Sequence, residues 1–421
     1  MINAERVFHR LQELGKIGYR EGGGVTRHAF TSEDRAAKDL VIKYMKEAGL
    51  EVREDAVGNV IGRREGKNPQ APVVLSGSHI DTVCDGGIFD GALGIIGAIE
   101  VLQTMNEQKV VTEHPIEVYA FNDEEGSRFS FSMFGSMGVI GRITEEDLAK
   151  KDRQGISVAE AMREQGYDPE KFRDAIRSPE ELKAFIELHI EQGKVLESKN
   201  LSVGIVTGIV NELWMKIRVI GEAGHAGATP MNFRKDALVA AAEMVQVIER
   251  EAKKTGTTVA TVGRLNVLPG GINIIPGQVE FTLDLRDISQ EVSDKVEREI
   301  FKEIDRICQE RGVRVETEIL QRIPPAPCSK GFQLAAKRAC EKIGLEYFCL
   351  PSGAGHDAMQ MVNICPIGMI FVRSKDGISH NPAEWSSKED CADGVKVLYH
   401  VLLETAVPIE DDSLCNEAVG C

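Results

Sequence analysis

Short apolar runs alternate with helical patterns along most of this chain. The clearest apolar runs lie at residues 73–75, 116–120, 185–188 and 368–372, and each has the character of a buried strand. Helical patterns lie between and around them, for example at 32–48 and 91–105. This alternation predicts an α/β fold with a mainly parallel sheet.

The segment from 211 to 326 has a different pattern and is predicted to be an inserted domain. A strand at 212–219 is followed by a helix at 235–254, strands at 257–267 and 278–286, a helix at 292–311 and a strand at 313–320. This order is that of a ferredoxin-like α+β sandwich. Since 421 residues exceed one usual domain, we expect residues 1–210 and 327–421 to form one discontinuous domain. The acidic tail at 409–421 is expected to fray.

Composition restricts the partners of the chain. Acidic residues outnumber basic ones 66 to 50, which gives a formal charge of −16. Nucleic acids and anionic membranes select basic surfaces, so neither is expected as a partner. The nine cysteines are odd in number and include no C-x-x-C pair, which argues against a disulfide framework and favours a reducing compartment. With no apolar run near the roughly 20 residues that span a bilayer and no signal peptide, the chain is predicted to be soluble and cytoplasmic.

Histidines and acidic residues recur where the predicted strands end or helices begin. They are His79, Asp90, Glu124, Glu125, His189 and His380. Open α/β sheets bind their ligands beyond the carboxyl ends of the strands. We therefore expect these side chains to meet at one edge of the sheet.

Taken singly, each of these elements has an ordinary structural explanation. The H-x-D pair of His79 and Asp81 is a weak signal, Asp90 could be only a helix N-cap, and the three acids at 123–125 could form a solvated loop. Because all of these residues are inferred to lie at one edge of the sheet, a metal site explains them better. Imidazole and carboxylate without thiolate suit zinc, with manganese, cobalt or nickel as alternatives.

Two ions bridged by a carboxylate, roughly 3.5–4 Å apart, would activate a shared water. Asp81 is expected to orient the imidazole of His79 rather than to bind metal. Of the adjacent Glu124 and Glu125, one can bind metal while the other transfers protons. The chain has no G-x-S-x-G elbow, no G-x-x-x-x-G-K-[ST] phosphate loop and no G-x-G-x-x-G fingerprint, so other chemistries are poorly supported.

Eight longer motifs occur in order along the chain. They are GSHIDTV, GGIFDGALG, NDEEGSRF, ELHIEQG, GEAGHAGATPM, GGINIIPG, PSGAGHDAM and DGISHNPAEW. Together they resemble the L-carbamoylase and allantoate amidohydrolase branch of the dinuclear-metal aminoacylase superfamily, over nearly the whole chain. Within that branch, VTGIV, GHAGATPM and CPIGMIFVRS look most similar to bacterial N-carbamoyl-L-amino-acid hydrolases.

The resemblance implies a role for each motif residue. It implies that His79, Asp90 and His189 bind one metal ion and that Asp90, Glu125 and His380 bind a second. Glu124 would be the general base, and His225 would bind substrate and stabilise the oxyanion from the partner subunit. Gln192, Asn273, Arg286, Gly355 and His356 resemble substrate-binding positions. The segment 211–326 resembles the family's lid and dimerisation domain, which implies a homodimer, and the other domain would be catalytic.

From the residues alone, the substrate positions have simpler interpretations. His225 is a plausible loop histidine, and Arg286 at a strand end suits a surface salt bridge. Asn273 beside two glycines suits a turn, and His356 with Asp357 could cap a helix. The loop at 22–27 also matches the branch, but no chemical role follows from its residues.

The expected reaction is hydrolysis of the carbamoyl C–N bond of an N-carbamoyl-L-amino acid to the L-amino acid, ammonia and carbon dioxide. A ureido carbon is a poor electrophile because two nitrogens donate into its carbonyl, so a hydroxide bridging two metals suits it, with His225 stabilising the oxyanion. Arg286 would pair bidentately with the substrate carboxylate. Allantoate amidohydrolase is the nearest alternative. A dipeptidase or aminoacylase and a catalytically silent metal-dependent binding protein also stay open.

Overall fold

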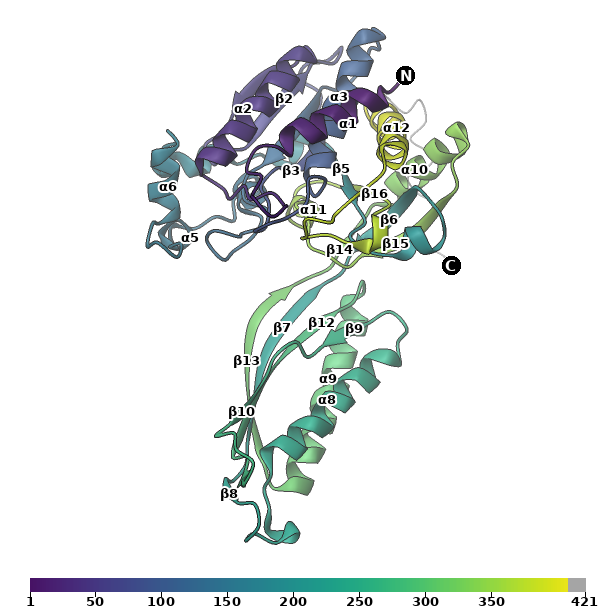
Figure 1. Ribbon diagram of the computed structural model, residues 1–421. Coiled ribbons are helices and arrows are strands. Elements are labelled where there is room, and N and C mark those ends of the chain that lie inside the picture. Colours follow the sequence, from purple (N-terminus) through teal and green to yellow (C-terminus); the bar gives the residue numbers. More distant parts are fainter. Residues whose placement is uncertain (408–421) are drawn as a thin grey trace. The chain divides into compact units, whose positions relative to one another are not determined.

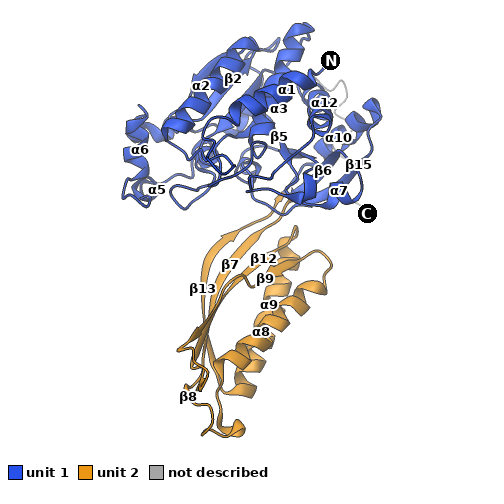
Figure 2. Cartoon of the chain, viewed as in Figure 1, with its two compact units in different colours: residues 1–208, 327–421 blue, residues 209–326 orange. Residues whose placement is uncertain are grey.

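The computed structural model describes residues 1–407, and the chain divides into two compact units (Figure 2). The first unit consists of Met1–Gly208 and the chain from Pro327 onward, and the second is Ile209–Ala326. The acidic tail that was expected to fray lies outside the described residues. Of the helices in residues 1–407, none combines the length and apolar character needed to cross a membrane.

The first unit is built on a nine-stranded sheet (Figure 1). Its strands are β1 (Glu51–Glu54), β2 (Val60–Arg64), β3 (Val73–His79), β4 (Ile116–Phe121), β5 (Leu182–Ile190), β6 (Val203–Ile209), β14 (Ala326–Pro327), β15 (Tyr347–Ser352) and β16 (Ile367–Val372). The order is β1-β2-β4-β3-β5-β16-β6-β14, with β15 also paired to β6. The central strands β4, β3, β5 and β16 are mutually parallel. The predicted α/β class with a parallel sheet is confirmed.

The four central strands are fully buried or nearly so, which explains why they appear in the sequence as continuous apolar runs. The helices of this unit are α1 (Ala4–Leu14), α2 (Ser32–Glu47), α3 (Ala92–Glu107), α4 (Phe134–Val139), α5 (Glu145–Ala149), α6 (Val158–Glu164), α7 (Val195–Ser198), α10 (Lys330–Ile343), α11 (Ala358–Met361) and α12 (Lys388–Thr405). Short 3₁₀ turns lie at Pro169–Ala175, Pro179–Glu181 and Lys375–Gly377. Helices α1, α3 and α12 pack on one another (Figure 1), and their apolar faces join the main core.

The parallel pairing fixes where the functional loops meet. In the register of the sheet, His79 pairs with Phe121, and Phe371 pairs with His189. The carboxyl ends of β3, β4, β5 and β16 therefore lie at one edge of the sheet, where the loops after them begin.

The second unit has a five-stranded antiparallel sheet in the order β10-β12-β7-β13, with β9 also paired to β12. Its elements are β7 (Glu212–Ile220), β8 (Gly224–His225), a 3₁₀ turn (Met231–Phe233), α8 (Ala237–Lys253), β9 (Val259–Thr261), β10 (Leu265–Leu268), β11 (Ile274–Ile275), β12 (Gln278–Arg286), α9 (Gln290–Arg311) and β13 (Arg314–Ile323). Every second residue of β12 is buried against α8 and α9, as expected for a strand with one covered face.

One strand of the second unit differs from the expectation. The single strand predicted at 257–267 is divided into β9 and β10, which pair with opposite ends of β12. The interruption contains Gly263, and there Arg264 exchanges hydrogen bonds with Thr282 instead of continuing the ladder. A glycine inside a strand provides no side chain to pack and commonly marks such a break.

Candidate metal centre

His79 is the last residue of β3 and is only 2% exposed. Its Nδ1 lies 3.1 Å from the backbone oxygen of Asp81, so the tautomer that donates there presents the lone pair of Nε2 to the opposite side. On that side Nε2 lies 3.7 Å from Asp90 Oδ1 and 3.8 Å from Glu124 Oε2. Burial would lower the pKa of His79, but Glu124, Asp81 and Asp90 raise it well above its usual value.

Asp90 reaches the same place from the loop between β3 and α3, and it is 6% exposed. The next residue, Gly91, has a φ of 63°, and a Cβ there would lie 2.5 Å from atoms of the His79 ring. Glycine is therefore required for Asp90 and His79 to approach each other this closely.

Glu124 and Glu125 follow β4 and are positioned by Asp81. The backbone N–H groups of the two glutamates donate to the two oxygens of the Asp81 carboxylate, at 3.1 and 3.0 Å. Asp81 Oδ1 also lies 3.6 Å from His79 Nδ1. One buried carboxylate thus orients three of the predicted site residues, which is the role expected for a group behind a metal site.

His189, at the end of β5, gives the clearest indication that the cluster suits a cation. Its Nδ1 lies 2.9 Å from the backbone oxygen of Ile190, which leaves the Nε2 lone pair facing Asp90 Oδ1 at 3.2 Å. That contact lacks hydrogen-bond geometry, and among the described residues Nε2 is buried without a hydrogen-bond partner. A lone pair facing a carboxylate is unfavourable unless a cation or a proton lies between them.

His380 completes the cluster from the loop after β16. It has a φ of 54°, and its Nε2 lies 3.1 Å from Asp90 Oδ2 and 3.4 Å from Glu125 Oε1. Gln192, after β5, donates from Nε2 to Asp90 Oδ2 at 3.0 Å. Unlike the other members, the His380 side chain is half exposed, which leaves the cluster open to solvent on one side.

The side chains form two three-residue donor sets that share Asp90. In each set the ligand atoms lie within 4.8 Å of one another: His79, Asp90 and His189 in the first, and Asp90, Glu125 and His380 in the second. A third set contains His79, Glu124 and Glu125, and a fourth contains Glu187, His189 and His356. The fourth is the poorer site because Glu187 already accepts hydrogen bonds from Ser78 Oγ and the Ala358 N–H.

The charges of the cluster fit divalent cations. Burial raises the pKa of Glu124 well above its usual range, and burial with the nearby Asp90 raises that of Glu125 to about 7. Contact with Asp90 raises the pKa of His380 to about 9. A bound cation favours ionised carboxylates and neutral imidazoles. The nitrogen and oxygen donors, the shared carboxylate and the His189 lone pair without a partner all suit such ions.

A family model described as peptidase family M20/M25/M40 matches residues 75–404. The match includes all of the clustered residues from His79 to His380. The chain belongs to this family. It is therefore a metal-dependent hydrolase, and the family resemblance drawn from the motifs is confirmed.

This M20/M25/M40 family member is 57% identical over 406 residues to an "N-carbamoyl-L-amino acid amidohydrolase" of Geobacillus stearothermophilus, covering 96% of this chain and 99% of the relative. It is 35% identical to an "allantoate amidohydrolase" of Bacillus subtilis, covering 94% of this chain and 96% of the relative. A crystal structure of a hydantoinase/carbamoylase family amidase from Burkholderia multivorans has a TM-score of 0.91 at 37% identity, covering 97% and 98% of the two chains.

The other predicted residues of the first unit lie close to this cluster. His356 is buried, with its ring 4.5 Å from that of His189, and it contacts Ser352 Oγ at 2.8 Å. Burial and the neighbouring His189 hold the pKa of His356 well below its usual value, which favours the neutral imidazole. Gly355 precedes it in the loop between β15 and α11.

In the second unit, the structure brings His225 and Asn273 together and places Arg286 elsewhere. The short strands β8 and β11 pair His225 with Ile274, and the Ala226 N–H donates to the Asn273 backbone oxygen. Both side chains are exposed. Arg286 is at the far end of β12, where it forms ion pairs with Glu212 and Asp284.

The loop at 22–27, which had no predicted role, supports the segment between His79 and Asp90. Val25 exchanges two backbone hydrogen bonds with Gly86. Arg27 is buried and donates to the backbone oxygens of Leu14, Ile17 and Ile80. Its conspicuous glycines and arginine were visible in the sequence, but its partners Ile80 and Gly86 are more than 50 residues away along the chain.

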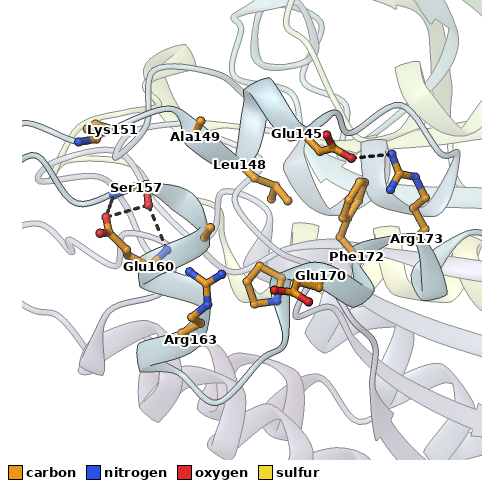
Figure 3. A pocket seen from close by; sticks show the side chains of 12 residues that line it. Glu145, Leu148, Ala149, Lys151, Ser157, Glu160, Arg163, Glu170, Phe172 and Arg173 are labelled. Carbon is orange, nitrogen blue, oxygen red and sulfur yellow. Dashed lines mark hydrogen bonds and ion pairs between the residues drawn. The ribbon is translucent and has the colours of Figure 1, made fainter.

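Two cavities lie away from these residues. A pocket of about 530 Å³ lies among α5, α6 and the Pro169–Ala175 turn, with Leu148, Arg163 and Phe172 in its wall (Figure 3). A groove of about 930 Å³ runs beside α10 and α12 at the amino ends of β5 and β16. Neither is lined by a residue of the four donor sets, so neither marks the reaction site.

Proposed function

We propose that this protein hydrolyses N-carbamoyl-L-amino acids to the L-amino acid, ammonia and carbon dioxide. The observation on which the proposal rests most is the pair of donor sets sharing Asp90, with the Glu124 carboxylate directly beside them. The 57% identity to the Geobacillus enzyme over nearly the whole of both chains supports this substrate class. The overall reaction consumes one water and breaks the carbamoyl C–N bond.

In this proposal His79, Asp90 and His189 bind one divalent ion, and Asp90, Glu125 and His380 bind another. Zinc suits these donors, and manganese, cobalt or nickel also suit them. When bound, such ions polarise the ureido carbonyl and increase the acidity of the attacking water.

Glu124 is the proposed general base. Its side chain is 10% exposed, and its Oε2 lies 3.8 Å from His79 Nε2. Burial raises the pKa of this carboxyl well above its usual range, which increases its tendency to accept a proton. It would take the proton of the attacking water and deliver it to the leaving nitrogen. Glu125, beside it, would bind metal instead, because it faces His380 and Asp90.

Gln192, Gly355 and His356 are proposed to line the substrate site near the metals, with Arg286 pairing with the substrate carboxylate. His225 and Asn273 would contact the ureido group, with His225 stabilising the developing negative charge on its oxygen. Arg286 must exchange its present partners, Glu212 and Asp284, for the substrate. Its fork of donors matches a carboxylate bidentately.

The geometry of the second unit favours a homodimer with composite sites. Arg286 is the last residue of β12, whereas Asn273 precedes the first residue of this strand, Gln278, by five positions, and His225 pairs with Ile274. A nine-residue strand spans roughly 26 Å, several times the length of a carbamoyl amino acid. One copy of this unit therefore cannot place both groups on one substrate, but two copies related by a two-fold axis can. Residues 211–326 would then act as lid and dimerisation domain of a cytoplasmic enzyme.

Allantoate hydrolysis is the second candidate, supported by the 35% identity to the Bacillus enzyme over 94% of this chain. A panel of N-carbamoyl-L-amino acids, allantoate, dipeptides and N-acyl amino acids, assayed after metal reconstitution, tests the proposal. We expect kcat/KM to be highest for an N-carbamoyl-L-amino acid. Preference for allantoate or a dipeptide would contradict the substrate class, and no turnover of any compound would indicate a binding protein.

A further inference from the structure

Glu384 lies four residues after His380 in the segment that leads into α12. Its side chain is 4% exposed, although the flanking Ala383 and Trp385 are exposed. A buried carboxylate must be compensated by hydrogen bonds or by positive charge. Its partners therefore show what it does.

One oxygen of Glu384 binds the backbone just before α3. Oε1 accepts hydrogen bonds from the N–H groups of Phe89, at 2.9 Å, and Asp90, at 3.1 Å. Phe89 and Asp90 lie 295 and 294 positions before Glu384 along the chain. The backbone that holds the shared ligand Asp90 is thus fixed from another loop.

The other oxygen binds the loop that contains His380. Oε2 accepts from Ser379 Oγ at 2.8 Å, and the same hydroxyl lies 3.1 Å from Asp90 Oδ2. Gln192 Nε2 donates to both Ser379 Oγ and Asp90 Oδ2. The Asp90 side chain is consequently oriented by groups that Glu384 holds in place.

Packing leaves little freedom in this arrangement. A Cβ on Gly87 would lie 2.0 Å from Glu384 Oε1, so the loop backbone lies directly against the carboxylate. The neighbouring Trp385 packs edge-on against Phe89, with ring centroids 5.4 Å apart. Two consecutive side chains therefore contact the Phe89–Asp90 segment from the same loop.

We propose that Glu384 is a positioning residue that holds Asp90 and His380 at the spacing required for the second metal ion. The inference rests on the proposed metal site and adds a residue to it that binds neither metal nor substrate. The loop after β3 and the loop after β16 each supply a ligand to that ion. Among the contacts of the described residues, the Glu384 carboxylate bonds directly to both loops.

The test compares metal binding by four proteins: wild type, Glu384→Gln, Ser379→Ala and the control Glu389→Gln. Glu389 is an exposed glutamate five residues farther on, in the first turn of α12. Calorimetric titration of the metal-free proteins with Mn²⁺ gives the affinities, and the visible spectrum of the Co²⁺-loaded proteins reports ligand geometry. Thermal melting of the metal-free proteins measures stability separately.

We expect Glu384→Gln to weaken the second Mn²⁺ roughly 10–100-fold, as is typical for groups that orient metal ligands, and to change the Co²⁺ spectrum. Ser379→Ala should do the same to a smaller extent, and Glu389→Gln should match wild type. Wild-type affinity and spectrum in Glu384→Gln, with only a lower melting temperature, would overturn the proposal. If Glu384→Gln does not fold, Ser379→Ala decides by the same criteria. If wild type binds no Mn²⁺, the proposed function fails as well, whereas failure of the variants alone removes only this inference.

Discussion

The two units of this protein hold their candidate residues in opposite ways. In the first unit, loops from four parallel strands bring imidazoles and carboxylates within a few ångströms, and most of them are buried. In the second unit, His225 and Asn273 are exposed. Arg286 lies at the carboxyl end of β12, where it forms ion pairs with Glu212 and Asp284. The donor sets of a metal centre thus lie within one unit, whereas we propose that the second unit's groups act on one small molecule only with the help of a second copy.

The largest expected effect concerns metal, because the described residues of the first unit offer no other evident means of activating water. Chelation should abolish hydrolysis, and Mn²⁺, Co²⁺, Ni²⁺ or Zn²⁺ should restore it. Activity and metal content are measured together through depletion and reconstitution. Full activity in rigorously metal-free protein would contradict the metal-dependent mechanism. The proposed difference between the two units would then fail as well.

The adjacent glutamates should respond differently to the same substitution. Glu124→Gln should retain both metals but lose roughly 10²–10⁴-fold in kcat, the usual contribution of general acid–base catalysis. Glu125→Gln should also lose metal, because Glu125 belongs to the set with Asp90 and His380. Elemental analysis measures the metal content of each variant, and steady-state kinetics measures its kcat. Equal metal loss in both variants would show that the roles of Glu124 and Glu125 are assigned wrongly.

The sequence predicted most of the first unit because its signals are local. Each central strand is a continuous apolar run, and each predicted ligand lies at the carboxyl end of a strand, in the loop after one, or just before a helix. Parallel pairing then dictates that these positions meet. Glu384 belongs to the motif DGISHNPAEW, but the sequence predicts no role for it. Its partners Phe89 and Asp90 are nearly 300 residues away, and nothing in the neighbouring sequence shows that its side chain is buried.

The second unit could be predicted as alternating strands and helices but not in its contacts. Period-two burial identified β12, whereas the break at Gly263 depends on hydrogen bonds to Thr282 in a neighbouring strand. The pairs of Arg286 with Glu212 and Asp284 agree with the salt bridge expected from the residues alone. The separation of Arg286 from His225 follows from the length of β12 and could not be predicted from either residue's neighbours in the sequence.

Substitution of Arg286 tests whether the second unit binds the substrate carboxylate. Arg286→Ala should raise KM roughly 10–100-fold with a smaller change in kcat, since hydrogen bonds between charged groups contribute about 1.5–3 kcal/mol. The matched control is Arg322→Ala, which removes another ion-paired arginine of this unit, bound to Glu297. An equal rise in KM in both variants would mean that Arg286 is only structural.

The pH dependence of the second metal ion tests the charges of the first unit's cluster. His380, with a pKa of about 9, and Glu125, with a pKa of about 7, hold protons in the metal-free protein below those values. Binding must release them, so affinity should fall about tenfold per pH unit from 9 to 7 and more steeply below 7. Titration calorimetry in buffers of different ionisation enthalpy counts the protons, and affinity independent of pH between 6 and 9 would contradict the assignment.

The most direct test of the composite site mixes two inactive proteins, His225→Ala and Glu124→Gln, under conditions that exchange subunits. If His225 acts on the neighbouring subunit's metals, one site of each heterodimer contains both defects and the other contains none. With random exchange and independent sites, activity should return to roughly a quarter of wild type. If mass spectrometry confirms exchange and activity stays at background, His225 serves its own subunit and the account of the second unit is wrong.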